Sequence, residues 1–137
     1  MPILKAFQPQ AVCLQLGADA HYLDPLARVC LTAQGWLEAV KDIKSLCVPI
    51  IAVGGGGYNQ TTVPRMWALA TAVLFDIELP DATPGSYFAR DTIRTLTDHE
   101  PPPVAPHDAD HAREFAEQTV TEIKNTLFER FGLPYGD

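Results

Sequence analysis

The sequence has few basic residues and little clustering of positive charge. Its 137 residues include 10 Lys or Arg against 17 Asp or Glu, which gives a formal net charge of −7. Because the basic residues are also scattered, the pattern lacks the concentrated positive surface that binds nucleic acid or an anionic membrane. We therefore expect no direct nucleic-acid partner and no membrane partner.

Cysteines and long apolar runs are also scarce. The three cysteines, Cys13, Cys30 and Cys47, are odd in number and lack the close pairs of a disulfide frame or a zinc site. Each lies in or beside an apolar segment, which predicts reduced, buried thiols. No run approaches the roughly 20 apolar residues of a membrane span, and the first residues lack the pattern of a signal peptide. These absences predict a cytoplasmic protein.

The residues that are present indicate an α/β fold. The composition, 47% apolar and 20% charged, is that of a globular protein, and the length predicts a single domain over residues 1–137. Two short apolar runs, 11–16 and 48–53, have the near-continuous pattern of strands buried on both faces of a parallel sheet. Between them, Thr32 can cap a helix with apolar positions at helical spacing: Trp36, Leu37, Val40, Ile43 and Leu46. The strands should therefore end at the same edge of the sheet.

Helices are predicted on both sides of this unit. Residues 2–7 have a helical texture that Pro9 ends. A second helix begins at Thr62, the candidate cap, with apolar positions at Val63, Met66, Trp67, Ala70, Val73, Leu74 and Ile77. Half of the prolines fall in residues 79–107, which predicts a surface connection. The period over 108–132 predicts a docking carboxyl-terminal helix, with Gly132 as its stop.

A glycine run follows the second strand. Gly54–Gly57 lead into Tyr58, and four residues without β-carbons are entropically costly unless the backbone needs unusual φ angles or approaches something closely. A ligand or another backbone should therefore lie against this run, although a simple turn is the alternative. Asp19 and His21 follow the first strand, at the same sheet edge, where open α/β sheets bind their ligands.

The segments Leu14–Asp19, Asp24–Leu26 and Gly54–Tyr58 together resemble the carboxyl-terminal third of the histone deacetylase superfamily. The Gly-Ala-Asp-Ala-His and Asp-Pro-Leu details are most similar to the bacterial acetoin-utilisation-type deacetylases. The resemblance spans residues 7–133. It implies a partial arginase/deacetylase-like fold, with three α/β/α layers around a short parallel sheet and a carboxyl-terminal helix.

The resemblance also implies roles for individual residues. In the family, the aspartate at the position of Asp19 is one of three protein ligands of a catalytic zinc ion. The tyrosine at the position of Tyr58 polarises the acetamide carbonyl and stabilises the oxyanion. Gly55, Gly56 and Gly57 would line the acyl tunnel, and Leu26 would form part of its wall. The chemistry agrees, because a carboxylate suits Zn²⁺ and a phenol can donate to an oxyanion. The implied substrate is an acetyl-lysine protein or a small acetylated amine.

The sequence departs from the family where the rest of the site should be. The family's other two zinc ligands and its adjacent histidine pair have no counterpart upstream of Asp19. Catalytic zinc requires three protein ligands and an open position. We therefore expect no cofactor for this chain alone, zinc only if a missing amino-terminal part or another chain completes the site, and no activity until then.

Some interpretations stay open at this stage. His21 is either a contact near the substrate or a satisfied polar residue, and Asp24 is expected to fix its own loop through backbone hydrogen bonds. His107 and His111 could bind a metal, but the acidic start of a solvated helix is favoured. A non-catalytic module that forms homo-oligomers through open sheet edges, or a truncated remnant, is the main alternative function. Nucleotide binding by the glycine run is weaker, because the P-loop lysine is absent.

Overall fold

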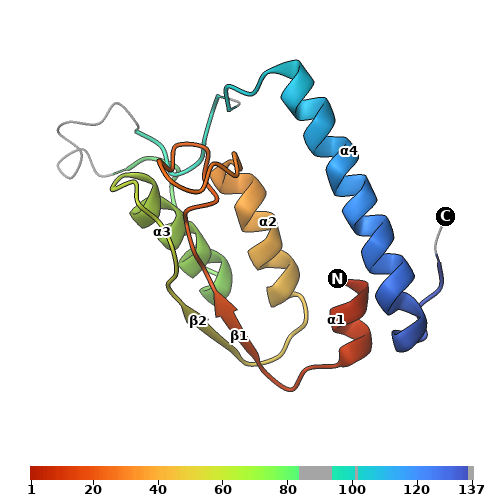
Figure 1. Cartoon of the computed structure of the whole chain (residues 1–137). Coiled ribbons are helices and arrows are strands. Elements are labelled where there is room, and N and C mark those ends of the chain that lie inside the picture. The colour runs from red at the N-terminus through yellow and green to blue at the C-terminus, as the bar shows by residue number, and fades with distance from the viewer. Residues whose placement is uncertain (84–93, 101, 136–137) are drawn as a thin grey trace. The chain divides into compact units, whose positions relative to one another are not determined.

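The computed structural model describes residues 1–83, 94–100 and 102–135 of the chain (Figure 1). The chain divides into two compact units, one formed by Ala11–Pro102 and the other by Met1–Gln10 with Pro103–Asp137. The expectation of a single domain concerns how these units pack together, and it stays a prediction. Part of the predicted connection over 79–107 lies outside the described residues.

The larger unit contains the predicted parallel strands. β1 (Val12–Gln15) pairs with β2 (Ile50–Val53) in parallel, from Val12 opposite Ile50 to Gln15 opposite Val53. α2 (Ala33–Lys44) connects the two strands, and α3 (Thr62–Phe75) follows β2 and packs against α2. The α/β prediction and the short parallel sheet are confirmed.

The core of this unit lies on one face of the sheet. It joins residues from both helices and from the segment that follows β1: Leu16, Ala18, Ala33, Trp36, Leu37, Val40, Met66 and Ala70. Leu14 and Ala52 pack against it from the strands. The alternate residues of β1 and β2 are exposed, with Ile51 at 66% and Val53 at 40%. The prediction that both strand faces are buried is therefore wrong for this structure, because α2 and α3 both cover the same face of the sheet. The third layer of the predicted fold stays a prediction.

The three cysteines lie at exposed positions of β1 and of the connecting segments. All three thiols are exposed, so the prediction of buried cysteines is wrong. Cys13 lies at an outward position of β1, whereas Cys30 and Cys47 lie in irregular connecting segments with φ angles of 62° and 55°. The apolar neighbours of Cys30 are themselves exposed, Val29 at 54% and Leu31 at 39%, so an apolar neighbourhood in the sequence does not imply burial there.

In the larger unit, side chains accept N–H groups at the starts of both helices. The Thr32 hydroxyl accepts the Gly35 N–H at 3.1 Å, which confirms the predicted cap of α2. The predicted cap of α3 is wrong, because Thr62 is already the first residue of that helix. Asn59 serves instead, since its Oδ1 accepts the N–H groups of Thr61 and Thr62 at 2.9 and 3.2 Å.

The smaller unit is helical. α1 (Pro2–Phe7) contacts the 3₁₀ segment η2 (Glu129–Phe131), which ends the sequence of α4 (Pro106–Ile123) and the π-helical η1 (Lys124–Phe128). The predicted helix over 108–132 and its stop at Gly132, with φ 61°, are confirmed. α4 has no buried residue, so the docking of its apolar stripe stays a prediction.

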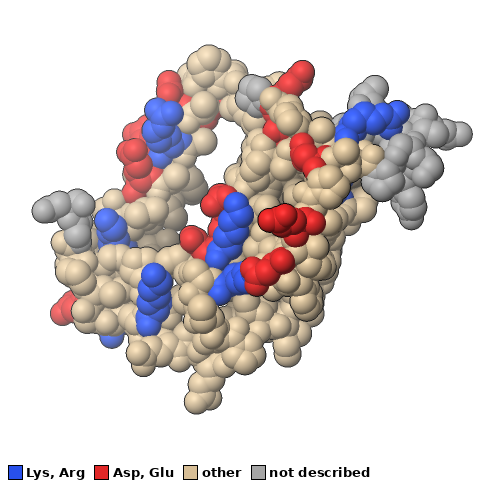
Figure 2. Space-filling view, turned by 180° about the vertical axis from the view of Figure 1, so that it is seen from behind, with Lys and Arg blue, Asp and Glu red and all other residues tan. Residues whose placement is uncertain are grey.

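Charged side chains of both signs are interspersed. On the face drawn in Figure 2, lysines and arginines of the described residues lie beside acidic side chains. None of the helices in the described part of the chain is long and apolar enough to cross a membrane. The expectations about nucleic-acid and membrane partners stay predictions.

Candidate functional site

The loops that follow β1 and β2 are joined beyond the strand ends. The Leu16 N–H donates to the Val53 carbonyl at 2.8 Å, which extends the ladder. The Ala18 N–H then donates to the Gly56 carbonyl at 2.7 Å. The Gly-Ala-Asp segment and the glycine run therefore lie side by side, as expected from two parallel strands.

The glycine run is packed too closely for side chains. A β-carbon at Gly55 would lie 2.7 Å from the Gln15 amide carbon, and one at Gly56 would collide with the Asp19 carboxylate. Gly57 has φ +147°, which favours glycine, and a β-carbon there would lie 2.7 Å from Val63. The close approach predicted for this run is confirmed, and its neighbours here are the β1 segment and α3.

Asp19 lies against Gly56 and is half-buried. Among the described residues there is no group of three or more His, Cys, Asp or Glu side chains that could hold a metal ion. A catalytic zinc site needs three protein ligands, so Asp19 and its described neighbours do not fit one by themselves. The assignment of Asp19 as a metal ligand stays a prediction.

Tyr58 and Leu26 are the exposed side chains of the site. Tyr58 is 57% exposed and Leu26 is 64% exposed. The positions of these two residues do not test their predicted roles, Tyr58 as the oxyanion donor and Leu26 as part of the tunnel wall. The same holds for Gly55, Gly56 and Gly57 as lining residues. What the structure provides is a fixed backbone beneath Tyr58.

Asp24 is the residue that fixes that backbone. It is 5% exposed, and its carboxylate accepts three N–H groups, from Leu26 at 2.9 Å, Ala27 at 3.2 Å and Tyr58 at 2.8 Å. Burial alone would raise the pKa of Asp24, but these hydrogen bonds outweigh it and hold the pKa below its ordinary value. The predicted local role is confirmed, whereas the bond to Tyr58 was not foreseen.

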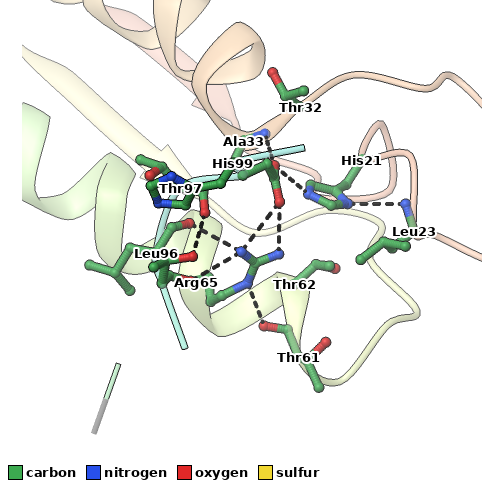
Figure 3. Close-up of polar contacts among 12 residues, drawn as sticks. His21, Leu23, Thr32, Ala33, Thr61, Thr62, Arg65, Leu96, Thr97 and His99 are labelled. Carbon is green, nitrogen blue, oxygen red and sulfur yellow. Dashed lines mark hydrogen bonds and ion pairs between the residues drawn. The ribbon is translucent and has the colours of Figure 1, made fainter. Parts of the chain in front are cut away.

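His21 is a buried residue of the loop that follows β1. Its Nδ1 accepts the Leu23 N–H at 3.1 Å, so Nε2 carries the proton and donates to Asp98 Oδ2 at 2.9 Å (Figure 3). Burial lowers the pKa of His21, mainly by desolvation, which agrees with a neutral ring. With both nitrogens engaged and no exposed surface, the geometry favours the satisfied polar contact over the substrate contact.

Asp98 connects three parts of the unit. It accepts the Ala33 N–H at the start of α2 at 2.7 Å and pairs with Arg65 of α3 at 3.3 Å. Both side chains of that pair are nearly inaccessible, at 1% for Arg65 and 3% for Asp98. Arg65 also donates to three carbonyls, those of Thr61, Thr95 and Leu96 (Figure 3). The cluster anchors the His21 loop to both helices.

Sequence reasoning missed Arg65 and Asp98. Asp98 falls in the proline-rich stretch that was expected to be a surface connection, and its partners lie 33 and 77 residues away. A charged residue within the otherwise apolar pattern of α3 was the only local signal. His107 and His111, by contrast, lie in the exposed first turns of α4, as the favoured interpretation expected.

Comparison with known proteins gives a consistent result. The family model described as "Histone deacetylase domain" matches residues 1–74. Histone deacetylase 9 of Arabidopsis thaliana is 39% identical over 93 residues, which are 65% of this chain and 22% of that protein. Histone deacetylase 1 of Homo sapiens is 40% identical over 87 residues, 63% of this chain and 18% of that protein. The chain thus spans about a fifth of the length of these curated relatives.

Proposed function

Because this chain belongs to the histone deacetylase superfamily, we propose that it is the carboxyl-terminal portion of a zinc-dependent deacetylase that hydrolyses acetyl amides, and that it is inactive by itself. The carrying observation is the Ala18–Gly56 hydrogen bond at 2.7 Å, which holds the two motif segments together at one sheet edge. We also propose that the protein is cytoplasmic. Within the superfamily, we propose that it is most similar to the acetoin-utilisation-type deacetylases.

In the proposed site each motif residue has a separate task. Asp19 would supply one carboxylate ligand to a zinc ion, and two further ligands would come from segments outside this chain. Tyr58 donates a hydrogen bond to the oxyanion that forms when water attacks the acetamide carbonyl. The glycines line the acyl tunnel and Leu26 forms its wall, while His21 supports the loop from below.

The same segments would complete the fold. Cys13, Ile51 and Val53 lie on the open face of a sheet that has two strands among the described residues. A two-stranded sheet has two unpaired edges. We propose that further strands and a third helical layer cover these surfaces in the complete enzyme.

Co-expression tests the proposal. The chain is produced with the amino-terminal segment of a matched relative that carries an Asp-x-His element and an adjacent histidine pair. We expect the co-purified complex to deacetylate an acetyl-lysine peptide or a small acetylated amine, and the two substrates distinguish the classes. Asp19→Asn is the control and should abolish activity. A stable complex without deacetylation of either substrate contradicts the proposal.

A second candidate function is a non-catalytic assembly module. It is favoured by the exposed apolar positions of the open sheet face, Ile51 at 66% and Val53 at 40%. This candidate predicts a homo-oligomer that forms through the sheet. Sedimentation over a wide range of concentrations decides it, since a monomer throughout contradicts the candidate.

A further inference from the structure

A single buried carboxylate joins the two loops of the proposed site. Asp24 Oδ1 accepts the N–H groups of Leu26 and Ala27, and Oδ2 accepts the N–H of Tyr58 across the site. We propose that Asp24 is a positioning residue that fixes Tyr58 relative to Leu26. The inference rests on the proposed function, because it gives these two residues a shared task.

The Ala18 N–H holds the glycine run at the Gly56 carbonyl, but the run itself restricts Tyr58 little. Glycine restricts the chain less than any other residue, and four of them precede Tyr58, with Gly57 at φ +147°. Tyr58 is 57% exposed, so neighbouring side chains constrain it weakly. The 2.8 Å bond to a buried carboxylate is charge-assisted and therefore among the stronger hydrogen bonds in proteins.

A neighbouring link acts in the same direction. Asn59 Nδ2 donates to the Leu23 carbonyl at 3.0 Å, and its Oδ1 caps α3. The chain is thus held at Tyr58 by Asp24 and at the next residue by Asn59, and both anchors reach the loop that carries Leu26. Tyr58 lies between two fixed points rather than at the end of a free hinge.

One substitution separates this role from general support of the loop. In Asp24→Asn, the side-chain oxygen keeps accepting from Leu26 and Ala27, whereas an NH₂ group replaces the acceptor that faces the Tyr58 N–H. Two donors then oppose one another, so the local turn survives and the bond between the loops is lost. Asp81→Asn is the matched control, because Asp81 accepts the Thr97 N–H at the same distance, 2.8 Å, and bonds to neither loop of the site.

The first measurement is amide hydrogen exchange in the full chain. In Asp24→Asn, we expect protection of the Tyr58 amide to fall by about tenfold, the size expected for a hydrogen bond to a charged group, while Leu26 changes by less than about twofold. Asp81→Asn should leave both amides unchanged. Unchanged protection of Tyr58 in Asp24→Asn overturns the inference.

The second measurement uses the co-expressed complex. Misplacing a group that acts in the transition state lowers kcat, so we expect Asp24→Asn to lower kcat by at least about tenfold with KM within about twofold. A wild-type kcat, or an equal loss in Asp81→Asn, overturns the inference. If the wild-type complex itself is inactive, the proposed function fails and the exchange result alone decides whether Asp24 holds Tyr58.

Discussion

At the scale of the residue, the structure depends on buried carboxylates that collect N–H groups from distant segments. Asp98 joins the His21 loop, the start of α2 and Arg65 of α3, and Asp24 joins the two loops of the site. A buried charge is costly to leave unpaired, so each partner depends on the others. These residues explain how the loops that follow β1 and β2 are held in defined positions.

Replacing Asp98 by alanine should destabilise the chain by about 3 kcal/mol, because the Arg65 guanidinium is left buried without its partner. Urea unfolding followed by circular dichroism measures the change. The double variant Asp98→Ala/Arg65→Met should recover part of the loss, since it removes the unpaired charge. A single variant as stable as wild type would contradict the importance of the cluster.

Asp81 should make stability depend on pH. Burial alone would raise its pKa, but hydrogen bonds from Thr97 and from His99 hold it below the ordinary value of 3.8. The unfolded chain therefore binds a proton at higher pH than the folded chain, so this contribution is complete above the unfolded pKa and is lost as the pH falls through the folded one.

Urea unfolding at pH 6 and pH 3 checks this expectation. The fall in unfolding free energy between the two values should be smaller in Asp81→Asn than in wild type. An identical fall in both proteins would show that Asp81 does not contribute.

At the scale of the element, periodicity was sufficient to predict the strands and helices but not their surroundings. The apolar runs of β1 and β2 and the spacing of Trp36, Leu37 and Val40 in α2 predicted the parallel unit. A four-residue apolar strand has the same sequence pattern whether one of its faces is covered or both. The exposure of Cys13 and Ile51 could therefore not be predicted from that pattern. The Asp98–Arg65 pair could not be predicted from the sequence either, because two residues that pair across 33 positions leave no local sequence pattern.

The glycine run offers a matched test of close packing. Gly54→Ala should be tolerated within about 1 kcal/mol, because its β-carbon would meet Trp67 at an ordinary 3.6 Å. Gly56→Ala should cost about 2 kcal/mol or more, because its β-carbon would collide with the Asp19 carboxylate. Thermal unfolding of both variants measures the difference. Equal stability would mean that the two loops are not packed as described.

At the scale of the whole molecule, the chain carries one half of a proposed site and one covered face of a sheet. Its matches span about a fifth of the length of the curated relatives. The lone Asp19 carboxylate, the exposed Tyr58 ring and the open strand faces are accounted for together if further segments complete both the metal site and the sheet.

Zinc content of the co-expressed complex tests this account most directly. We predict that the purified complex retains a single zinc ion per assembly, that Asp19→Asn loses it, and that neither chain alone retains zinc, because a catalytic site needs three protein ligands. Zinc retention unchanged in the Asp19→Asn complex, or a stable wild-type complex that binds no zinc, would contradict the account.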